Sequence, residues 1–321
     1  MYVNGEHLAH HLGGYLPFTV ELPFTVESPS LTVSPLSQSG ITQESDPYST
    51  AAFLIQVRVK DVSDTSWHTR GKQTLKRGGM FYTAQSGIWQ SVWYEWVPEN
   101  HITQMRLTPD YDAQRCELML YGPHHFSQIA LTTEAGAAYP IISSCQETDE
   151  SGNPFTRIHF ALPADMPFEP WTPDSPHLYP LVIRADQDII HSYFAMRCYS
   201  VERDGQGTPR FCLNHKPLFL HGILDQGYWP DGLMTAPRDE AFVYDIELVK
   251  SFGFNMIRKH IITWNCSRLA RRRGFLTVQP RHSLYAKGFS VGYLIPLGWL
   301  KLRSSTGTPM YLNTSYSAFP K

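Results

Sequence analysis

The chain has 321 residues, of which 42% are hydrophobic and 17% charged, and these values are ordinary for a globular protein of about two domains. The composition excludes a fibrous chain and a wholly disordered one. The formal net charge of −2 is unevenly distributed, because residues 1–262 carry −11 and residues 263–321 carry +9.

The last 59 residues differ in composition from the rest of the chain. No aspartate or glutamate follows Glu247, whereas the overall frequency of 29 acids in 321 residues would place about seven in the remaining 74. We interpret residues 263–321 as a basic tail foreign to the preceding sequence, arising from a shifted reading frame, a retained intron or a mistaken gene model. Its charges are diluted by apolar residues, so we expect no nucleic-acid partner.

Glycine, proline and aromatic residues indicate the fold class. The 24 prolines, 22 glycines and 13% aromatic residues favour short strands joined by turns, so we expect a mostly β protein. The five cysteines are scattered and never form a Cys-x-x-Cys pair, which disfavours a disulfide framework and a structural zinc site. We expect buried thiols, no metal and no cofactor; the cysteines are Cys116, Cys145, Cys198, Cys212 and Cys266.

Two further features bear on metals and membranes. The rings of His10 and His11, and those of His124 and His125, would alternate across a strand, which disfavours metal binding by either pair. The longest apolar run of the tail, 13 residues between Lys287 and Lys301, is interrupted by glycine and proline, so we expect no membrane span. The N-terminus shows no secretory signal, and the sequence leaves localisation and oligomeric state undetermined.

The first module begins with a hairpin. Asn4 and Gly5 are typical of a two-residue turn between strands. Residues 27–50, rich in Ser, Thr and Pro, predict a mobile surface loop. Alternating apolar residues predict a strand over 53–61, and a second group of strands is expected over 80–97.

From His101 onward the pattern predicts short strands separated by turns, which is typical of a β-sandwich of about 100 residues. The expected strands are 102–107, 116–121, 129–132, 157–162, 178–185 and 189–195.

The periodicity changes after residue 210. Residues 211–221 predict a strand pair around Asn214, and residues 239–252 predict a helix that Gly253 ends. Residues 254–258 predict a second buried strand. A strand, a helix and a strand form one βαβ unit, which indicates the start of an α/β domain.

Several segments carry a family resemblance. Residues 211–222 (FCLNHKPLFLHG), 245–250 (DIELVK) and 253–258 (GFNMIR) resemble the opening of the catalytic barrel of glycoside hydrolase family 2, which includes β-galactosidases, β-glucuronidases and β-mannosidases. Earlier segments agree in order. Those at 3–5, 11–15, 71–73 and 86–90 resemble the family's jelly-roll domain, and those at 171–179 and 193–197 resemble its immunoglobulin-like domain, although Ala195 stands where the family usually has glycine.

The resemblance implies a division into domains and a chain truncated at both ends. We expect an incomplete jelly-roll, or galactose-binding-like, domain over 1–98 and an immunoglobulin-like β-sandwich over 99–204. The first βαβ unit of a (β/α)8 barrel would follow over 205–262, and the non-family tail over 263–321.

The chemistry of the family sets a requirement that this chain does not meet. A retaining glycosidase uses two carboxylates about 5 to 5.5 Å apart, and in the family both are glutamates on later barrel strands. A complete barrel takes about 250 residues, whereas 117 remain from Gly205 onward. We therefore expect no catalytic residue here, and a family 2 glycosidase fragment, acting on β-glycosides, that is inactive by itself.

Substrate-facing residues are expected where the first two barrel strands end. Polar and aromatic side chains that follow the first strand could bind a sugar, or the two aromatic rings could simply cover the barrel mouth. Arg258 resembles a family arginine that organises the acidic site, with an ion-pair role as the alternative, and His260 is either a site residue or a structural histidine. The candidate carbohydrate-binding residues are Asp225, Gln226, Tyr228, Trp229, Arg258 and His260. The alternative function is a non-catalytic carbohydrate-binding or scaffold protein.

Overall fold

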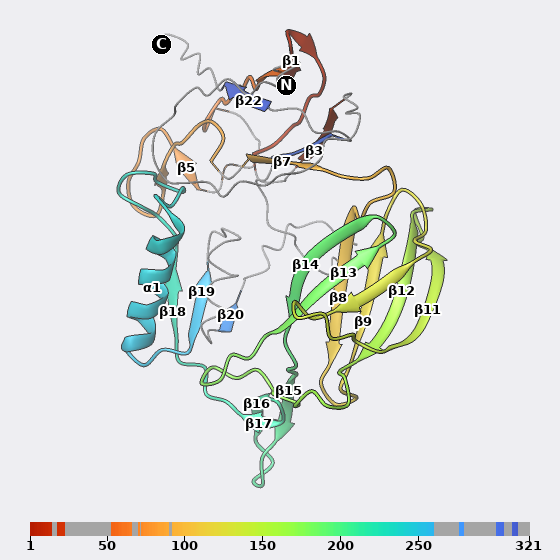
Figure 1. Cartoon of the computed structure of the whole chain (residues 1–321). Coiled ribbons are helices and arrows are strands. Elements are labelled where there is room, and N and C mark those ends of the chain that lie inside the picture. Colours follow the sequence, from red (N-terminus) through yellow and green to blue (C-terminus); the bar gives the residue numbers. More distant parts are fainter. Residues whose placement is uncertain are drawn as a thin grey trace. The chain divides into compact units, whose positions relative to one another are not determined.

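The computed structural model describes residues 1–14, 18–22, 53–65, 70, 72–89, 92–259, 276–278, 300–304 and 310–313. Strands make up most of the regular structure in this part of the chain, as expected, and one helix accompanies them (Figure 1). The chain divides into two compact units. Unit 1 comprises Met1–Val97, Tyr228–Thr235 and Val291–Lys321, and unit 2 comprises Pro98–Gly227 and Ala236–Ser290.

Unit 1 contains small sheets. One has the strand order β2-β1-β4-β22, a second has the order β3-β21-β7, and β5 pairs with β6. The bounds are β1 (Tyr2–Val3), β2 (Glu6–His7), β3 (Phe18–Leu22), β4 (Phe53–Gln56), β5 (Gln73–Thr74), β6 (Tyr82–Thr83), β7 (Val92–Trp96), β21 (Leu300–Ser304) and β22 (Met310–Asn313).

The hairpin at the start of unit 1 is confirmed. Tyr2 pairs with His7 and Val3 with Glu6, and the two turn residues both have positive φ, 50° at Asn4 and 89° at Gly5. Asparagine and glycine tolerate this left-handed region best, so the local sequence selects the turn.

One strand expectation in unit 1 needs correction. The strand expected over 53–61 ends at Gln56, because its antiparallel partner β1 has only two residues with which to pair. Ile55 is fully buried, whereas Val59 is 44% exposed. The group of strands expected over 80–97 is present as the two short strands β6 and β7, and the loop expected over 27–50 lies outside the described residues.

Unit 2 contains the expected β-sandwich. A four-stranded antiparallel sheet, in the order β11-β12-β9-β8, lies against a three-stranded sheet in the order β10-β13-β14. The bounds are β8 (Gln104–Asp110), β9 (Arg115–Tyr121), β10 (Ile129–Thr132), β11 (Ile141–Thr148), β12 (Pro154–Ala161), β13 (Tyr179–Ala185) and β14 (Asp188–Phe194). Six of these strands match the sequence expectation within a few residues.

The seventh strand, β11, was not expected from the sequence. It is an edge strand that pairs with β12 alone, and seven of its eight residues are exposed, so it lacks an alternating apolar face. Its pairing therefore comes from the backbone of β12 rather than from side-chain burial.

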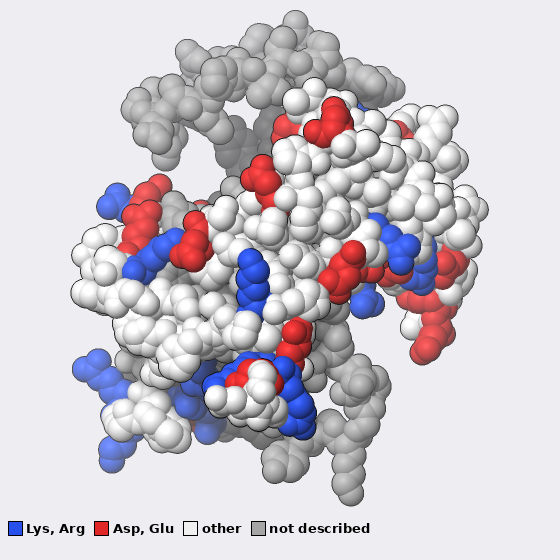
Figure 2. Space-filling model, turned by 90° about the horizontal axis from the view of Figure 1, so that it is seen from below, with Lys and Arg blue, Asp and Glu red and all other residues white. Residues whose placement is uncertain are grey.

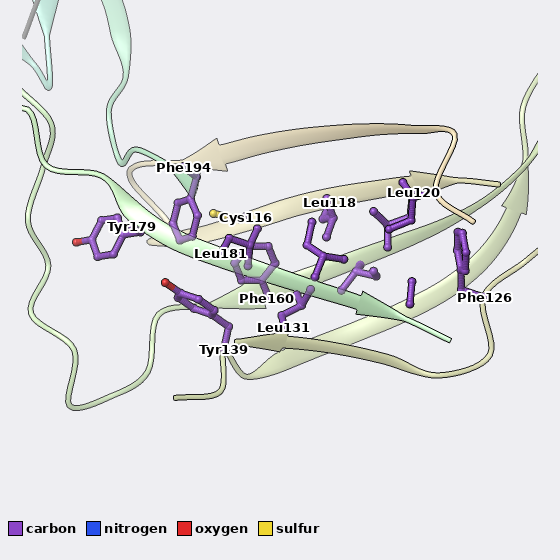
Figure 3. Close-up of a cluster of buried hydrophobic side chains, with 14 of the residues drawn as sticks. Cys116, Leu118, Leu120, Phe126, Leu131, Tyr139, Phe160, Tyr179, Leu181 and Phe194 are labelled. Carbon is purple, nitrogen blue, oxygen red and sulfur yellow. The ribbon is translucent and has the colours of Figure 1, made fainter. Parts of the chain in front are cut away.

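The core of the sandwich is built from the inward residues of both sheets. Leu118 and Phe160 from one sheet and Leu181 and Ile183 from the other are fully buried in one cluster, and Figure 3 shows Phe160 between the two sheets near Tyr139 and Phe194. Cys116 belongs to this cluster, and burial raises the pKa of its thiol to about 12.

The expectation of buried thiols holds for only part of the set. Cys116 and Cys212 are buried, but Cys145 is exposed and Cys198 is half-buried, because Cys145 lies on the exposed edge strand and Cys198 lies in the segment between two sheets. All four are free thiols, and Cys266 lies outside the described residues.

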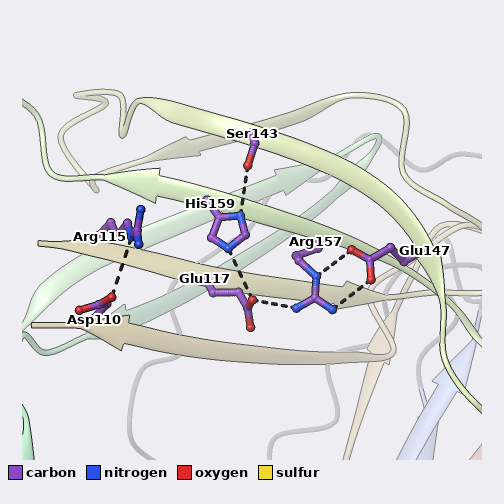
Figure 4. Close-up of polar contacts among 7 residues, drawn as sticks. All are labelled: Asp110, Arg115, Glu117, Ser143, Glu147, Arg157 and His159. Atoms are coloured by element: carbon purple, nitrogen blue, oxygen red, sulfur yellow. Dashed lines mark hydrogen bonds and ion pairs between the residues drawn. The ribbon is translucent and has the colours of Figure 1, made fainter. Parts of the chain in front are cut away.

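An ion-pair network crosses the outer face of the four-stranded sheet. The Arg157 guanidinium donates to the Glu117 carboxylate at 2.7 Å and to both carboxylate oxygens of Glu147 at 2.7 and 3.0 Å (Figure 4). His159 lies 3.5 Å from Glu117 and 3.1 Å from the Ser143 hydroxyl. The network links β9, β12 and β11, and so it ties the edge strand to the sheet.

Unit 2 continues into a small antiparallel sheet and then a parallel one. Strands β15 (Tyr199–Arg203), β16 (Pro209–Leu213) and β17 (Lys216–Pro217) pair in that order. They lead to β18 (Gly222–Asp225), helix α1 (Asp239–Ser251) and β19 (Met256–Lys259), and β18 pairs with β19 in parallel. Phe242 and Ile246 are buried on one face of α1, and Gly253 follows it with φ 84°, so the expected helix is confirmed. The strand pair expected over 211–221 forms β16 and β17, and the first strand of the βαβ unit is β18, which follows that range.

The parallel sheet has one strand more than the two of the expected βαβ unit. Strand β20 (Leu276–Val278) from the basic tail pairs in parallel with β19, which makes a three-stranded sheet in the order β18-β19-β20. The tail strands β21 and β22 also pair in parallel, within unit 1. Short segments of the basic tail that contain leucine therefore form strands in spite of its unusual charge. Within the part of the chain that the structure describes, no helix has the length and apolar character needed to cross a membrane.

Replacing Phe160 by Ala should destabilise the sandwich by about 3–5 kcal/mol, because the ring is fully buried and leaves a cavity among rigid neighbours. Urea denaturation followed by circular dichroism measures the change in unfolding free energy. Ile142→Ala is the matched control, since Ile142 is 59% exposed on the edge strand and should change stability by less than about 0.5 kcal/mol. Equal effects of the two substitutions would contradict this account of the core.

Replacing Arg157 by Met should lower the urea midpoint at pH 7, because Glu117 and Glu147 would lose their partner. The hydrogen bond from Arg157 is the main cause that lowers the pKa of the Glu147 carboxyl. The stabilisation that the Glu147 carboxylate provides is therefore present above the ordinary glutamate pKa of about 4.3. It is lost as the pH falls through the lowered pKa that Glu147 has in the folded state.

The difference in midpoint between R157M and the parent chain should consequently shrink below about pH 4. Arg184→Met, a change of an exposed arginine on β13, serves as the control and should show no such trend. A difference that stays constant between neutral and strongly acidic pH would show that the charges of this network do not stabilise the sheet.

Candidate functional site

The carboxyl-terminal edge of the parallel sheet carries the first candidate residues. Leu224 pairs with Arg258 and Asp225 pairs with Lys259, so Asp225 ends β18 and Arg258 is the next-to-last residue of the neighbouring strand β19. Arg258 lies on the central strand, where Val278 of β20 is its partner on the other side. In parallel sheets this edge is where binding loops gather.

The register also separates these two side chains. Successive residues of a strand point to opposite faces, and Asp225 is in register with the residue after Arg258. The two candidate residues therefore share an edge of the sheet but lie on opposite faces of it. From the sequence, both residues were expected at the same edge of the sheet. Only the strand register shows that their side chains lie on opposite faces.

Asp225 has a local structural role. It is half-buried, and its carboxylate accepts a hydrogen bond of 2.8 Å from the backbone N–H of Gly227, which has φ 60°. This is an Asx-type turn that directs the chain away from β18. Gln226 lies in this turn with an exposed side chain, and His260 lies outside the described residues.

The aromatic candidates belong to unit 1. Tyr228–Thr235 packs within that unit, where the Tyr228 ring stacks on Tyr82 with 5.2 Å between ring centroids and 27° between planes. The pKa of Tyr82 is raised, first by burial and then by Tyr228. The backbone of Trp229 exchanges hydrogen bonds of 2.7 and 3.1 Å with Leu233, and its side chain is half-buried. One face of the Tyr228 ring is thus taken by another tyrosine.

Side chains of unit 1 anchor this loop. Gln85 accepts a hydrogen bond of 3.0 Å from the Met234 backbone N–H and donates one of 3.5 Å to the Gly232 carbonyl. The Thr235 hydroxyl donates to the Trp89 carbonyl at 2.7 Å, and Met234 is 4% exposed. The loop is held in place by the module that precedes the sandwich in sequence.

Tyr82 and Gln85 were not among the residues predicted from the sequence. They lie almost 150 positions from the loop that they contact, and no periodic pattern relates residues at such a distance. Residues 86–90, which resemble a segment of the family's jelly-roll domain, include Trp89. This motif is the part of the sequence that lies nearest to the residues that contact the loop.

Charges of both signs occur together on the face shown in Figure 2. Figure 2 shows acidic and basic side chains on the same face of the molecule, several of them side by side. Among the described residues, the ion pairs are distributed over the sandwich and the β15–β17 sheet.

Solved structures provide the comparisons, since no protein-family model and no curated protein sequence matches the chain. A β-glucuronidase from Ruminococcus gnavus is 16% identical, with a TM-score of 0.41, and the match covers 57% of this chain and 30% of that enzyme. A β-glucuronidase from Bifidobacterium dentium is 15% identical, with a TM-score of 0.43, over 56% of this chain and 30% of that one. A β-glycosidase from Bacteroides vulgatus is 20% identical, with a TM-score of 0.42, over 62% and 26%.

This chain spans less than a third of the length of each of these proteins. Two of these three structures are thus β-glucuronidases, and the third is a β-glycosidase.

Replacing Gln85 by Ala should release the Tyr228–Thr235 loop, because the Met234 amide loses its acceptor. Amide hydrogen exchange at Met234 should become faster by about 10-fold or more, corresponding to a hydrogen bond worth about 1.5 kcal/mol. Gln226→Ala, which changes an exposed residue, should leave that rate unchanged. Unchanged protection of Met234 in Q85A would contradict this anchoring role.

Proposed function

We propose that this chain carries the carbohydrate-binding part of a family 2 glycoside hydrolase that acts on β-glycosides, of the β-galactosidase or β-glucuronidase type. One observation carries the proposal: two of the resembling segments, 245–250 and 253–258, lie in α1 and at β19 of a parallel β18-α1-β19 unit. This unit follows the seven-stranded sandwich and the small β15–β17 sheet. The order of the modules and their architecture agree with the sequence resemblance.

The exposed apolar residues of the parallel sheet also support a role within a larger barrel. Parallel strands usually have both faces covered, yet Ile223 is 37% exposed and Leu224 46% exposed on β18. On α1, Tyr244 is 65% exposed. Further strands and helices of a barrel would cover such surfaces.

The chain as a separate protein should not complete hydrolysis. Double displacement needs a proton donor and a nucleophile, both carboxyl groups, on the two sides of the glycosidic bond. No carboxylate side chain follows Glu247, and Asp225 is engaged in closing its own turn. Sugar binding without turnover is the activity that these residues favour.

A carbohydrate-binding or scaffold protein without any catalytic partner is the second candidate. The exposed part of Tyr228, 38% of the residue, favours it, because aromatic surfaces near polar loops bind sugars through stacking and need no carboxylate pair. In that case unit 1 would bind sugar irrespective of Asp225.

The full chain should show no turnover above background on a panel of chromogenic β-galactosides, β-glucuronides and β-mannosides. Calorimetry with galactose and glucuronic acid tests binding. Asp225→Ala should weaken any binding by about 10- to 100-fold, the loss expected for a hydrogen bond to a charged group, without altering turnover. Asp165→Ala, an exposed change in the sandwich, is the control.

The two candidates differ in which variant loses binding. Weaker binding in D225A favours the glycosidase-derived site, whereas loss in Tyr228→Ala alone favours the binding module. Clear hydrolysis by the purified chain would refute the proposed inactivity.

A further inference from the structure

Three side chains with metal-binding atoms meet at the end of unit 2 where the sandwich passes into the β15–β17 sheet. Asp112 lies in the turn between β8 and β9, Cys198 directly precedes β15, and His215 lies in the turn between β16 and β17. The His215 Nε2 atom is 2.7 Å from an Asp112 carboxylate oxygen and 3.6 Å from the Cys198 sulfur. All three potential ligand atoms lie within 4.8 Å of one another.

The backbone that carries two of these side chains is held tightly. Asn214 accepts a hydrogen bond from the Cys198 N–H through its side-chain oxygen, and its own N–H donates to the Cys198 carbonyl, each at 3.0 Å. Its side-chain amide also donates to the carbonyl of fully buried Trp171 at 3.1 Å. Cys198 and the turn at His215 are therefore fixed relative to one another before any ion binds.

A fourth residue orients the imidazole ring. The Nδ1 atom of His215 lies 2.7 Å from the Glu202 carboxylate on β15, and a carboxylate can only accept, so Nδ1 donates. This contact turns Nε2 toward Cys198 and Asp112. A carboxylate behind a ligating histidine is the usual second partner in metal sites, where it fixes the ring and strengthens the ligand.

The donor set selects the class of ion. A thiolate, an imidazole and one carboxylate suit Zn²⁺, whereas Mg²⁺ and Ca²⁺ prefer oxygen ligands alone. In a tetrahedral zinc site the ligating nitrogen and sulfur lie about 3.5 Å apart, close to the 3.6 Å found between His215 and Cys198. The nitrogen and the carboxylate oxygen would need about 3.4 Å, and Asp112, with a side chain 67% exposed in a turn, has room to move outward from 2.7 Å.

We propose that Asp112, Cys198 and His215 bind a zinc ion, with water in the fourth position and Glu202 orienting the histidine. On binding, zinc replaces the proton on His215 Nε2 and the thiol proton of Cys198. The expectation of no metal came from the absence of a Cys-x-x-Cys pair and of usable histidine pairs, but these ligands come from three distant segments. The site does not depend on any sugar-binding role of the chain.

The alternative is that the cluster is only an ion-pair triad. Asp112 and Glu202 flank His215 and raise the pKa of its imidazole, so the charged ring would then bridge two carboxylates. Such a triad needs His215 and both acids but makes no use of the Cys198 sulfur. The cysteine therefore separates the two interpretations.

The test uses the full chain after treatment with a chelator, titrated with Zn²⁺ by calorimetry and with Co²⁺ by absorption spectroscopy. The parent should bind one ion per chain, and Co²⁺ should produce a thiolate-to-cobalt charge-transfer band. Cys198→Ser should abolish the band and weaken Zn²⁺ binding by more than about 100-fold, while Glu202→Gln should weaken it by about 10- to 100-fold. His215→Asn should resemble the serine variant, and asparagine suits the φ of 62° at that position.

Matched controls exist elsewhere in unit 2. Cys145→Ser changes an exposed thiol, and His191→Asn changes an exposed histidine that lies 3.0 Å from Glu134; both should bind zinc as the parent does. Circular dichroism checks that each variant folds. If C198S does not fold, Asp112→Asn, a change in an exposed turn, takes its place as the deciding variant. Absence of zinc binding by the parent, or binding that persists in the folded ligand variants, would overturn the proposal.

Discussion

The buried side chain of Trp171 is the contact that joins the sandwich to the sheets that follow it in unit 2. Its indole is fully buried with Leu213, and Leu178, Leu220 and Met256 pack against the pair. These residues come from the sandwich, the β16 strand and the parallel sheet, so one aromatic side chain joins three substructures. The Arg197 guanidinium lies over the same ring, 4.5 Å from its centroid, and covers it from solvent.

The backbone of Trp171 extends this role by hydrogen bonds. Its N–H donates to the Met196 carbonyl at 2.9 Å, and its carbonyl accepts from the Asn214 side chain. Asn214 in turn holds the backbone of Cys198. The proposed zinc ligands and the first strands of the parallel sheet thus rest on the same buried junction, and a change at Trp171 would disturb both.

The two candidate sites differ in how they are supported. Asp225 and Arg258 lie at the ends of strands that have few described neighbours, Asp225 as the last residue of β18 and Arg258 as the next-to-last of β19, and apolar residues beside them are exposed. Asp112, Cys198 and His215 lie at turns anchored to the sandwich, which has the largest buried cluster of the described residues. A surrounding core that fixes the side chains favours a binding site, because side chains that are loosely held lose conformational entropy when they bind an ion or a sugar.

Local sequence determined those features that depend on a few adjacent residues. The Asn4–Gly5 turn, the ends of α1 and the six apolar sandwich strands follow from backbone preferences and from periodic burial. Tertiary structure alone decided the pairing of β11, the third parallel strand β20 and the opposite faces of Asp225 and Arg258. It also decided the meeting of Asp112 with His215, which are 103 residues apart. A local pattern reports which face of an element is buried, but register and the closure of long loops depend on the free energy of the whole packed chain.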